Sequence, residues 1–290
     1  MSCSLENKAI AVTGAGQGIG EATALLAASL GASVLVNDID AHATARVAAE
    51  INERGGRAHA HAADISQWSS GQALVDTALA RFGRLDGLVN NAGFFKIAPL
   101  LDSSEADFTE TIAVNLVGAA ACAQAAAAHM LERKSGAIVN IVSGAQCGMI
   151  GLGAYGASKG ALASLTYAWA IELANTGVRL NAVSPMADTQ MAHKTREYLS
   201  ALSIPLPDAV PPASANAPVI CYLLSDASTD IHGQVVRIDG GALALMTHPA
   251  IMAPVLRRES WTADAVAEAF AAHLAKLQQQ LGVVQIELVR

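Results

Sequence analysis

The chain is poor in charge and lacks basic clusters. Only 15% of its 290 residues are charged, and the formal net charge is −7 at pH 7. A nucleic-acid surface needs a stripe of Lys and Arg to neutralise phosphates. The nearest approach to one is the pair Arg257 and Arg258. The sequence therefore argues against a nucleic-acid partner.

Paired cysteines and long apolar runs are also missing. The four cysteines, at positions 3, 122, 147 and 221, show no paired spacing and no Cys-x-x-Cys, which favours free thiols in a reducing compartment. No stretch reaches the ~18 to 20 uninterrupted apolar residues of a membrane span. The first residues, MSCSLENKAIAVTG, lack the basic start and apolar segment of a signal peptide. We expect a soluble, cytoplasmic protein without a membrane segment.

Histidine gives no metal signature. His59 and His61 alternate within one short β-rich run and so share one side of it. A metal site needs a third ligand at a sensible spacing, and none lies nearby in the sequence. We therefore predict no metal.

The chain does have a high apolar content, 52%, arranged as short β-rich runs that alternate with longer Ala- and Leu-rich segments. This alternation predicts an α/β fold with a parallel, doubly wound sheet and helices on both faces. Strands that are apolar nearly throughout agree with a sheet covered on both sides. The seven expected strands are 9–13, 33–37, 57–63, 85–93, 136–143, 178–185 and 233–239.

Two stretches depart from this alternation. No Pro/Gly/Ser-rich linker divides the chain before residue 245, so we expect one domain over residues 1–245. Within it, the Pro-rich residues 186–213 follow the sixth strand and are typical of a lid. The tail, 246–290, should contain an amphipathic helix at 262–281 that packs on the domain or on another subunit. Its apolar residues recur at spacings of three and four: Val266, Phe270, Leu274, Leu277 and Leu281.

A glycine motif follows the first strand. In TGAGQGIG, residues 13–20, Gly14, Gly18 and Gly20 allow a tight turn and a close backbone approach to a pyrophosphate at the N-terminus of the next helix. Glycines at such turns also serve packing alone. The position between a strand and a helix is the context that supports dinucleotide binding.

An acidic residue ends the second strand. Asp38 follows the glycine turn by about twenty residues, where a carboxylate binds the adenosine ribose hydroxyls and repels a 2′-phosphate. The turn itself, residues 15–17, offers no Arg or Lys for such a phosphate. The alternative is that Asp38 only caps the helix that starts near Asp40. We predict NAD rather than NADP.

At this point the chain resembles the short-chain dehydrogenase/reductase superfamily, over roughly residues 5–245 and in the family's order. TGAGQGIG is similar to its glycine motif, ADI at 63–65 to its adenine-contacting segment, and NNAG at 90–93 to the segment beneath the cofactor. The residues at the positions of the family's catalytic tetrad are Asn115, Ser143, Tyr155 and Lys159.

The resemblance implies a single Rossmann-type domain that binds NAD. Tyr155 and Lys159 belong to both the catalytic and the cofactor-binding sets. The other implied cofactor contacts are Gly14, Gln17, Gly18, Ile19, Gly20, Asp38, Ile39, Asp64, Ile65, Asn91, Ala92, Gly93, Pro185 and Thr189. Family members commonly form dimers or tetramers through helices equivalent to the Ala-rich segments 106–131 and 155–175, so a homo-oligomer is expected.

The resemblance also implies roles for the tetrad. Tyr155 and Lys159 lie four residues apart and so share one helical face. Tyr155 would be the acid/base, Lys159 would lower its pKa, Ser143 would hold the substrate oxygen, and Asn115 would hold a proton-relaying water. Taken singly, each has an ordinary alternative: a surface pair, the end of a strand, a polar helix residue.

Two departures from the family pattern concern the substrate side. Ser143 precedes Tyr155 by only twelve residues, one fewer than the family spacing, and Met186 stands where most members have glycine. The expected pocket residues are Cys147, Met149, Met186, Met191 and His193, although an exposed loop position is the simpler interpretation of His193.

Those mostly apolar residues favour an apolar or cyclic secondary alcohol or ketone as the substrate. One alternative is a 3-hydroxyacyl thioester dehydrogenase, for which the only basic feature is ERK at 132–134. The other is a non-catalytic NAD-binding scaffold, which the presence of both Tyr155 and Lys159 disfavours.

Overall fold

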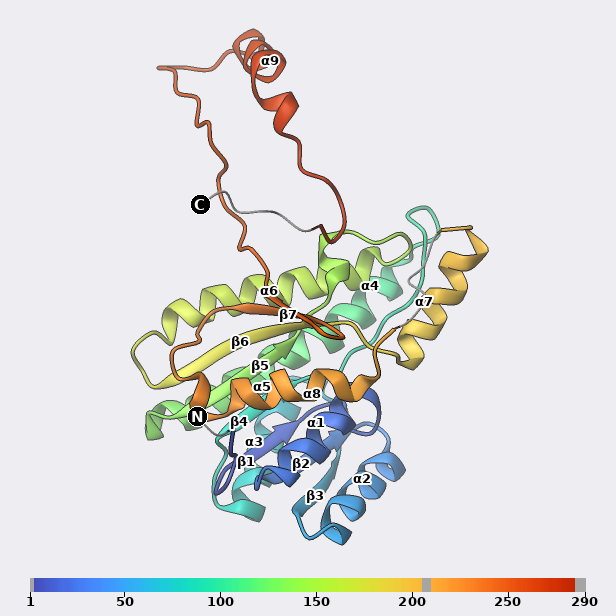
Figure 1. Cartoon of the computed structure of the whole chain (residues 1–290), viewed down its shortest axis with the longest axis vertical. Coiled ribbons are helices and arrows are strands. Elements are labelled where there is room, and N and C mark those ends of the chain that lie inside the picture. Colours follow the sequence, from blue (N-terminus) through green and yellow to red (C-terminus); the bar gives the residue numbers. More distant parts are fainter. Residues whose placement is uncertain (1–2, 205–209, 285–290) are drawn as a thin grey trace.

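A single eight-stranded sheet organises the protein. The computed structural model describes residues 3–204 and 210–284, and its sheet has the strand order β3-β2-β1-β4-β5-β6-β7-β8 (Figure 1). The strands are β1 Ala9–Val12, β2 Ser33–Asp38, β3 Arg57–Ala62, β4 Gly87–Asn90, β5 Gly136–Ile141, β6 Val178–Pro185, β7 Val235–Asp239 and β8 Ala242–Leu245. The first seven are parallel, which confirms the predicted α/β class.

The eighth strand was not predicted. β8 runs antiparallel to β7 after a two-residue turn at Gly240 and Gly241, where Gly240 has φ +58°. Gly-Gly between two apolar runs is a hairpin signal. The sequence therefore contains a marker for this strand, although the prediction for the domain over residues 1–245 included only seven strands.

Helices cover both faces of the sheet. Their bounds are α1 Gly18–Ser29, α2 Ala41–Glu53, α3 Ser69–Phe82, α4 Glu105–Ile112, α5 Ala119–Arg133, α6 Gly153–Glu172, α7 Gln190–Ala201, α8 Ala217–Leu224 and α9 Ala263–Ala272. One apolar cluster joins α1, α2 and α8 to the sheet, and another joins α3 and α5 to its opposite face. The core is thus two apolar layers separated by the sheet, as in doubly wound folds.

The strand order reverses between β1 and β4. The chain winds outward from β1 to β3 and then in the other direction from β4 to β7. In such sheets, the loops at the carboxyl ends of the two central strands separate and leave a crevice for a ligand. The glycine turn follows β1 and the NNAG segment follows β4, so both predicted motifs meet there.

A π-helical segment, Ala113–Gly118, joins α4 and α5 into one continuous helix. By length and composition, this helix of 29 residues, Glu105–Arg133, would suffice to cross a membrane, but 56% of its apolar window is buried inside the protein. It packs against α3, α6 and the sheet. We therefore assign it to the core of the domain.

The predicted lid contains more regular structure than expected, and the tail contains less. The predicted lid, 186–213, carries α7, whereas its residues 205–209 lie outside the described part. In the tail, α9 ends at Ala272, and only a 3₁₀ turn, Leu274–Leu277, follows it. The predicted helix at 262–281 is therefore wrong in its second half. A short helix needs tertiary packing to be stable. Leu281, at the end of the predicted helix, is 92% exposed and supplies no such packing.

Candidate active site

A cavity of about 810 Å³ opens at the carboxyl ends of the central strands. It is lined by Ser143, Tyr155 and Lys159 and by every predicted cofactor residue except Gly20. Four of the five predicted substrate residues, Met149, Met186, Met191 and His193, also line it. Asn115, Gly20 and Cys147 are not part of its wall. The fold thus brings residues from positions 14 to 193 around one space.

The glycine turn is built by steric necessity. Gly14 and Gly18 have φ near +61°, which L side chains rarely adopt. A Cβ on Gly14 would lie 2.6 Å from the Ala92 Cα, and one on Gly20 would lie 2.2 Å from the Gly14 oxygen. Gly20 is therefore a packing glycine behind the turn. The space in front of Gly14 and Gly18 is the cradle that a pyrophosphate needs.

Asn91 ties this turn to the end of β4. Its Nδ2 donates to the carbonyl oxygens of Thr13 at 3.0 Å and Gly14 at 2.9 Å. The Thr13 hydroxyl in turn accepts from the backbone N–H groups of Asn91 and Ala92. These bonds hold the two loops of the crevice at a fixed separation, so the NNAG segment acts as the floor of the site.

Asp38 faces the cavity and does not cap a helix. Its carboxylate accepts from the backbone N–H of Gly16 at 3.0 Å and of Asp40 at 3.1 Å. The cap of α2 is Asp40, which accepts from His42 and Ala43, and these bonds lower the pKa of Asp40. The helix-cap alternative for Asp38 is therefore excluded. Its position beside the glycine turn fits a ribose-binding carboxylate.

Sequence reasoning missed one cation next to the glycine turn. Arg46, on α2, donates to the Gly16 carbonyl at 2.9 Å and forms an ion pair with Glu21 at 2.7 Å. This pairing raises the pKa of Arg46. Nothing in the turn itself pointed to Arg46, because it lies eight residues beyond Asp38 on the next helix. Its guanidinium is already shared between Glu21 and the backbone.

Tyr155 and Lys159 lie on one face of α6, as predicted. The Lys159 Nζ is 5.8 Å from the centroid of the Tyr155 ring and donates to the Ile141 carbonyl at 2.7 Å. Burial lowers the pKa of Lys159 to about 8. Burial also raises the pKa of Tyr155, although its hydrogen bond with Ser143 acts in the opposite direction. The expected lowering of the Tyr155 pKa is therefore absent in the protein alone, because burial outweighs the hydrogen bond.

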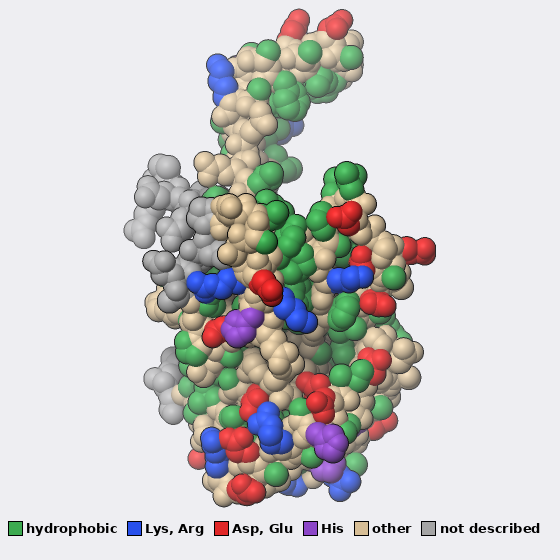
Figure 2. Space-filling view, turned by 90° about the vertical axis from the view of Figure 1, so that its right-hand side faces the viewer, with side chains coloured by type: hydrophobic (Ala, Val, Ile, Leu, Met, Phe, Trp, Pro, Cys, Tyr) green, Lys and Arg blue, Asp and Glu red, His purple; other side chains and the backbone are tan. Residues whose placement is uncertain are grey.

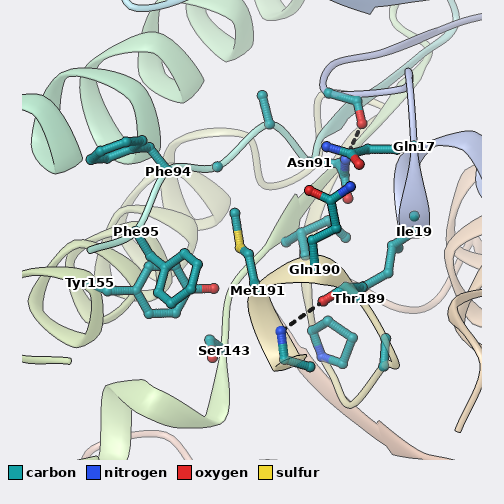
Figure 3. Close-up of a pocket in the computed structure, with 18 of the residues that line it drawn as sticks. Gln17, Ile19, Asn91, Phe94, Phe95, Ser143, Tyr155, Thr189, Gln190 and Met191 are labelled. Carbon is teal, nitrogen blue, oxygen red and sulfur yellow. Dashed lines mark hydrogen bonds between the residues drawn. The ribbon is translucent and has the colours of Figure 1, made fainter. Parts of the chain in front are cut away.

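Ser143 lies two residues beyond the end of β5 and faces the cavity. Its Oγ accepts from the Ala145 N–H at 3.1 Å at the start of a 3₁₀ turn, Gly144–Cys147. The same side chain lines the cavity next to the Tyr155 hydroxyl (Figure 3). The ordinary role and the catalytic role thus coexist in one residue.

Asn115 lies behind the cavity, in the π-helical segment. Its Oδ1 accepts from the Phe94 N–H at 2.7 Å, and its Nδ2 donates to the Phe94 carbonyl at 2.8 Å and to Ser158 at 2.9 Å. The side chain is fully buried, and these bonds occupy both of its amide ends. π-Helical turns are frequent at functional sites. We interpret Asn115 as a clamp that positions the loop after NNAG.

Aromatic side chains that the sequence did not single out form part of the substrate wall. Phe94 and Phe95 directly follow the NNAG motif and line the cavity with Leu152. The Phe95 ring contacts the Tyr155 ring edge-on, with centroids 6.0 Å apart (Figure 3). Their position next to a recognised motif was the available signal.

Residues of the predicted lid, in α7 and just before it, form the opposite wall. Thr189 caps α7 by accepting from the Ala192 N–H at 3.2 Å, and Met191 projects into the space between Thr189 and Tyr155 (Figure 3). His193 lines the rim, where its Nε2 lies 2.5 Å from Asp188. Its side chain is 67% exposed. His193 therefore lines the cavity, as a substrate contact would, and is also an exposed residue.

Metal-binding geometry is not found in the described ranges, 3–204 and 210–284, where no group of three or more His, Cys, Asp or Glu side chains converges. His59 and His61 lie on β3, at the edge of the sheet. Burial lowers the pKa of each.

A dinucleotide cradle, an acidic ribose ligand and a Ser-Tyr-Lys group in one cavity define a nucleotide-dependent oxidoreductase of the doubly wound class. The chain belongs to the short chain dehydrogenase family, whose family model matches residues 8–199. This confirms the resemblance seen in the sequence motifs.

Several relatives match nearly their whole length. A (2S)-[(R)-hydroxy(phenyl)methyl]succinyl-CoA dehydrogenase subunit of Thauera aromatica is 37% identical over 243 residues, 82% of this chain and 97% of the relative. A cis-4-hydroxycyclohexanecarboxylate dehydrogenase of Sinomonas cyclohexanicum is 37% identical, covering 81% and 96%. A 3-oxoacyl-[acyl-carrier-protein] reductase of Thermotoga maritima is 37% identical, covering 82% and 98%.

A solved structure agrees over most of the chain. The crystal structure of a short chain dehydrogenase from Mycobacterium avium has a TM-score of 0.83 and 32% identity, covering 94% of this chain and 96% of that one. The relatives are dehydrogenases and reductases, so the chain is an oxidoreductase that uses a nicotinamide cofactor and acts on CH–OH or carbonyl groups.

Proposed function

We propose that this protein is an NAD-dependent dehydrogenase of a secondary alcohol, or a reductase of the matching ketone, with an apolar and cyclic substrate. The observation that carries the proposal is the single cavity that joins Ser143, Tyr155 and Lys159 to the glycine turn and Asp38. A scaffold without activity has no need for a buried lysine next to a tyrosine in that position.

The residues around the cavity fit the cofactor. Gly14, Gly18 and Asp38 line the cavity. The space beside the two glycines takes the pyrophosphate, and Asp38 takes the adenosine ribose. When bound, NAD(H) accepts or supplies the hydride at its nicotinamide ring. Pro185 and Thr189 line the region next to Tyr155, where the nicotinamide has to lie for that chemistry.

The chain's own groups handle the proton. The Tyr155 hydroxyl donates a proton to the carbonyl oxygen in reduction and removes it from the alcohol in oxidation. Ser143 shares a hydrogen bond with Tyr155 and is placed to donate one to the same substrate oxygen. Lys159, buried and with a pKa of about 8, exchanges a proton near neutral pH and supplies positive charge that favours the tyrosinate.

Cofactor choice rests on Asp38 and Arg46. A carboxylate at the ribose repels a 2′-phosphate, and the nearest cation, Arg46, is engaged by Glu21 and the Gly16 carbonyl. Both features support NAD over NADP.

The substrate class rests on the cavity wall. Phe94, Phe95, Met149, Leu152 and Met191 present aromatic and flexible apolar surface near Tyr155, which suits a ring-bearing substrate. The names of two relatives include a phenyl or a cyclohexane ring. A thioester substrate is the second candidate, because the relative with the phenyl ring is named for a succinyl-CoA compound and another relative is a 3-oxoacyl-[acyl-carrier-protein] reductase.

The basic residues at 132–134 lie away from the cavity. Arg133 ends α5 and Lys134 precedes β5, which places them at the amino ends of the strands, whereas the cavity opens at the carboxyl ends. One cation, Arg196 on α7, does line the cavity, so the thioester candidate rests on this residue and on the names of the relatives. We further propose a cytoplasmic location, because all four cysteines are free thiols.

The test is an initial-rate assay of nicotinamide absorbance over secondary alcohols that include cyclic alcohols, steroids and 3-hydroxyacyl-CoAs, each with NAD and NADP. We expect NAD-dependent turnover of a cyclic alcohol that falls at least ~1,000-fold in Tyr155→Phe. Turnover of acyl-CoA compounds alone would favour the second candidate. NAD binding without turnover of any substrate would overturn the enzymatic proposal.

A further inference from the structure

Arg237, on β7, is a largely buried cation that the proposed chemistry does not use. Lys and Arg side chains normally lie in solvent, as those on the face shown in Figure 2 do. The Arg237 side chain is only 15% exposed, and it is not part of the cavity wall. Burying a charge costs free energy unless polar groups surround it. The contacts of Arg237 therefore indicate its role.

The guanidinium of Arg237 lies against the end of β6. Its Nη1 donates to the Pro185 carbonyl at 3.3 Å, to the Ser184 hydroxyl at 3.4 Å and to the Ser184 carbonyl at 3.5 Å. Its Nη2 pairs with Asp239 at 3.0 Å. The three oxygens of β6 lie at the long end of hydrogen-bond range. The cation therefore attracts all three at once instead of forming one short, directed bond.

The same guanidinium supports the loop that follows β5. A Cβ on Gly144, the residue after Ser143, would lie 3.3 Å from the Arg237 Nη1, so the guanidinium fills the space beside Gly144. Ser143 and Pro185 both line the cavity. Arg237 thus lies behind two neighbouring segments of the cavity wall.

Asn216 holds the next carbonyl along the chain from the other face of the sheet. Its Nδ2 donates to the Met186 carbonyl at 3.0 Å, and the residue is 1% exposed. Asn216 directly precedes α8. Ile238 belongs to the apolar cluster of α8, and successive side chains of a strand alternate, so Arg237 points to the opposite face. The carbonyls of Pro185 and Met186 are therefore held from both faces.

This support lies at the point where precise placement is needed. Pro185 and Met186 line the cavity together with Thr189, where the proposed function places the nicotinamide ring. Hydride transfer requires a fixed distance between the ring and the alcohol carbon, and a small displacement lowers the rate steeply. Groups that line such a site need a second layer of residues that hold them in place.

We propose that Arg237 and Asn216 are positioning residues for the nicotinamide end of the cofactor, acting through the carbonyls of Pro185 and Met186. This inference rests on the proposed function, because it takes NAD(H) as the ligand. Neither side chain lines the cavity, so each acts on the ring only through that segment. The adenosine end of the cofactor, at the glycine turn and Asp38, is held by other elements and does not depend on them.

The test compares the binding of two ligands, NADH and ADP-ribose, which lacks the nicotinamide. Both dissociation constants are measured by calorimetry for the wild type and for Arg237→Met. We expect NADH to bind roughly 10-fold more weakly to the variant, about what one hydrogen bond to a charged group contributes. ADP-ribose should bind as it does to the wild type. A general loss of structure would weaken both ligands alike.

Arg179→Met is the matched control. Arg179, on β6, is also partly buried and donates to backbone carbonyls, those of Leu223 at 2.8 Å and Ser225 at 2.9 Å. It lies at the amino end of the strand, away from the cavity. Its loss should lower the melting temperature and leave both affinities unchanged. Arg237→Lys keeps a cation beside oxygens that require no planar fork, so it should restore most of the NADH affinity.

Asn216→Ala covers the case in which Arg237→Met fails to fold. It removes the support of the same segment from the other face, so the same loss of NADH affinity without loss of ADP-ribose affinity is expected. Unchanged NADH affinity in the folded variant, or an equal loss for both ligands, would overturn the inference alone. A wild type that binds neither ligand would overturn the proposed function, and this inference with it.

Discussion

At the scale of single residues, Lys159 is a buried cation retained at a cost to stability. Burial lowers its pKa from 10.5 to about 8, so below pH 8 the folded protein holds a charge that is more stable in the unfolded chain. Because the folded-state pKa lies below the unfolded one, the free energy of unfolding rises with pH between about 8 and 10.5 at this residue. The buried charge lowers the stability of the fold, and its function is to act on Tyr155.

We predict that Lys159→Met is inactive and more stable than the wild type. A shift of this size corresponds to about 3 kcal/mol, and losing the hydrogen bond to the Ile141 carbonyl offsets about 1 kcal/mol of it. The free energy of unfolding at pH 7, from urea titration, should rise by about 2 kcal/mol. A variant less stable than the wild type would contradict this account of Lys159.

Asp38 and Asp40 provide a matched pair for testing the cofactor site. Asp38→Asn removes the charge at the ribose and should reduce the preference for NAD over NADP by roughly 10- to 100-fold, since a charge at hydrogen-bond range contributes about 1.5 to 3 kcal/mol. Asp40→Ala removes only the cap of α2, which should cost about 1 kcal/mol of stability and leave the preference unchanged. The measurement is kcat/KM with each cofactor; equal preferences in wild type and Asp38→Asn would refute the assignment.

The catalytic residues and the glycines of the turn could be predicted from the sequence, because their chemistry requires particular residue types at particular spacings. Ser143, Tyr155 and Lys159 reach one cavity with Gly14, Gln17, Gly18 and Ile19 of the glycine turn, as their shared place at the carboxyl ends of the strands predicts. Gly20, Asn115 and Cys147 fall outside the cavity wall. A sequence motif shows that a residue is required, but it does not show whether that residue contacts the ligand or supports the residues that do. Phe94 and Phe95 were missed because the residues that line a substrate pocket follow no fixed sequence pattern.

At the scale of elements, the alternation of apolar runs located seven strands because buried parallel strands have to be apolar throughout. It gave no sign of the π-helical segment Ala113–Gly118, which depends on contacts of Asn115 with distant residues. It overextended the helix of the tail, because spacing alone does not reveal whether a partner surface is present. Elements that local patterns specify were predicted, and those that tertiary contacts specify were not.

The clamp by Asn115 leads to a prediction for the π-helical segment. Asn115→Leu leaves the half-buried N–H and carbonyl of Phe94 without their Asn115 partners, which should cost about 1 kcal/mol of stability and lower kcat at least several-fold by loosening the loop beside Lys159. Ser158→Ala removes another partner of Asn115 but leaves the bonds to Phe94, so its kcat should stay near wild type. Thermal melts and initial rates check both; wild-type kcat in Asn115→Leu would refute the clamp.

At the scale of the whole molecule, the arm, residues 246–284, returns to the body beside the active site. Its return crosses the loop that follows Ser143, where Gly282 donates to the Cys147 carbonyl and a Cβ on Gly144 would lie 2.9 Å from Val283. A side chain at position 144 would therefore have to displace the Val283 side chain. Whatever holds the arm also holds the loop next to the catalytic serine.

This connection predicts the effect of removing the return alone. A chain that ends after Leu281 keeps α9 and the root of the arm but loses the bond to Cys147, so the loop at 144–147 gains freedom. We expect the KM for the alcohol to rise several-fold, because the loop carries the substrate side of the cavity, while the KM for NAD and the molar mass stay unchanged. Cys147→Ser keeps the carbonyl that accepts this bond and should behave as wild type. An unchanged KM for the alcohol would show that the return only passes over the loop.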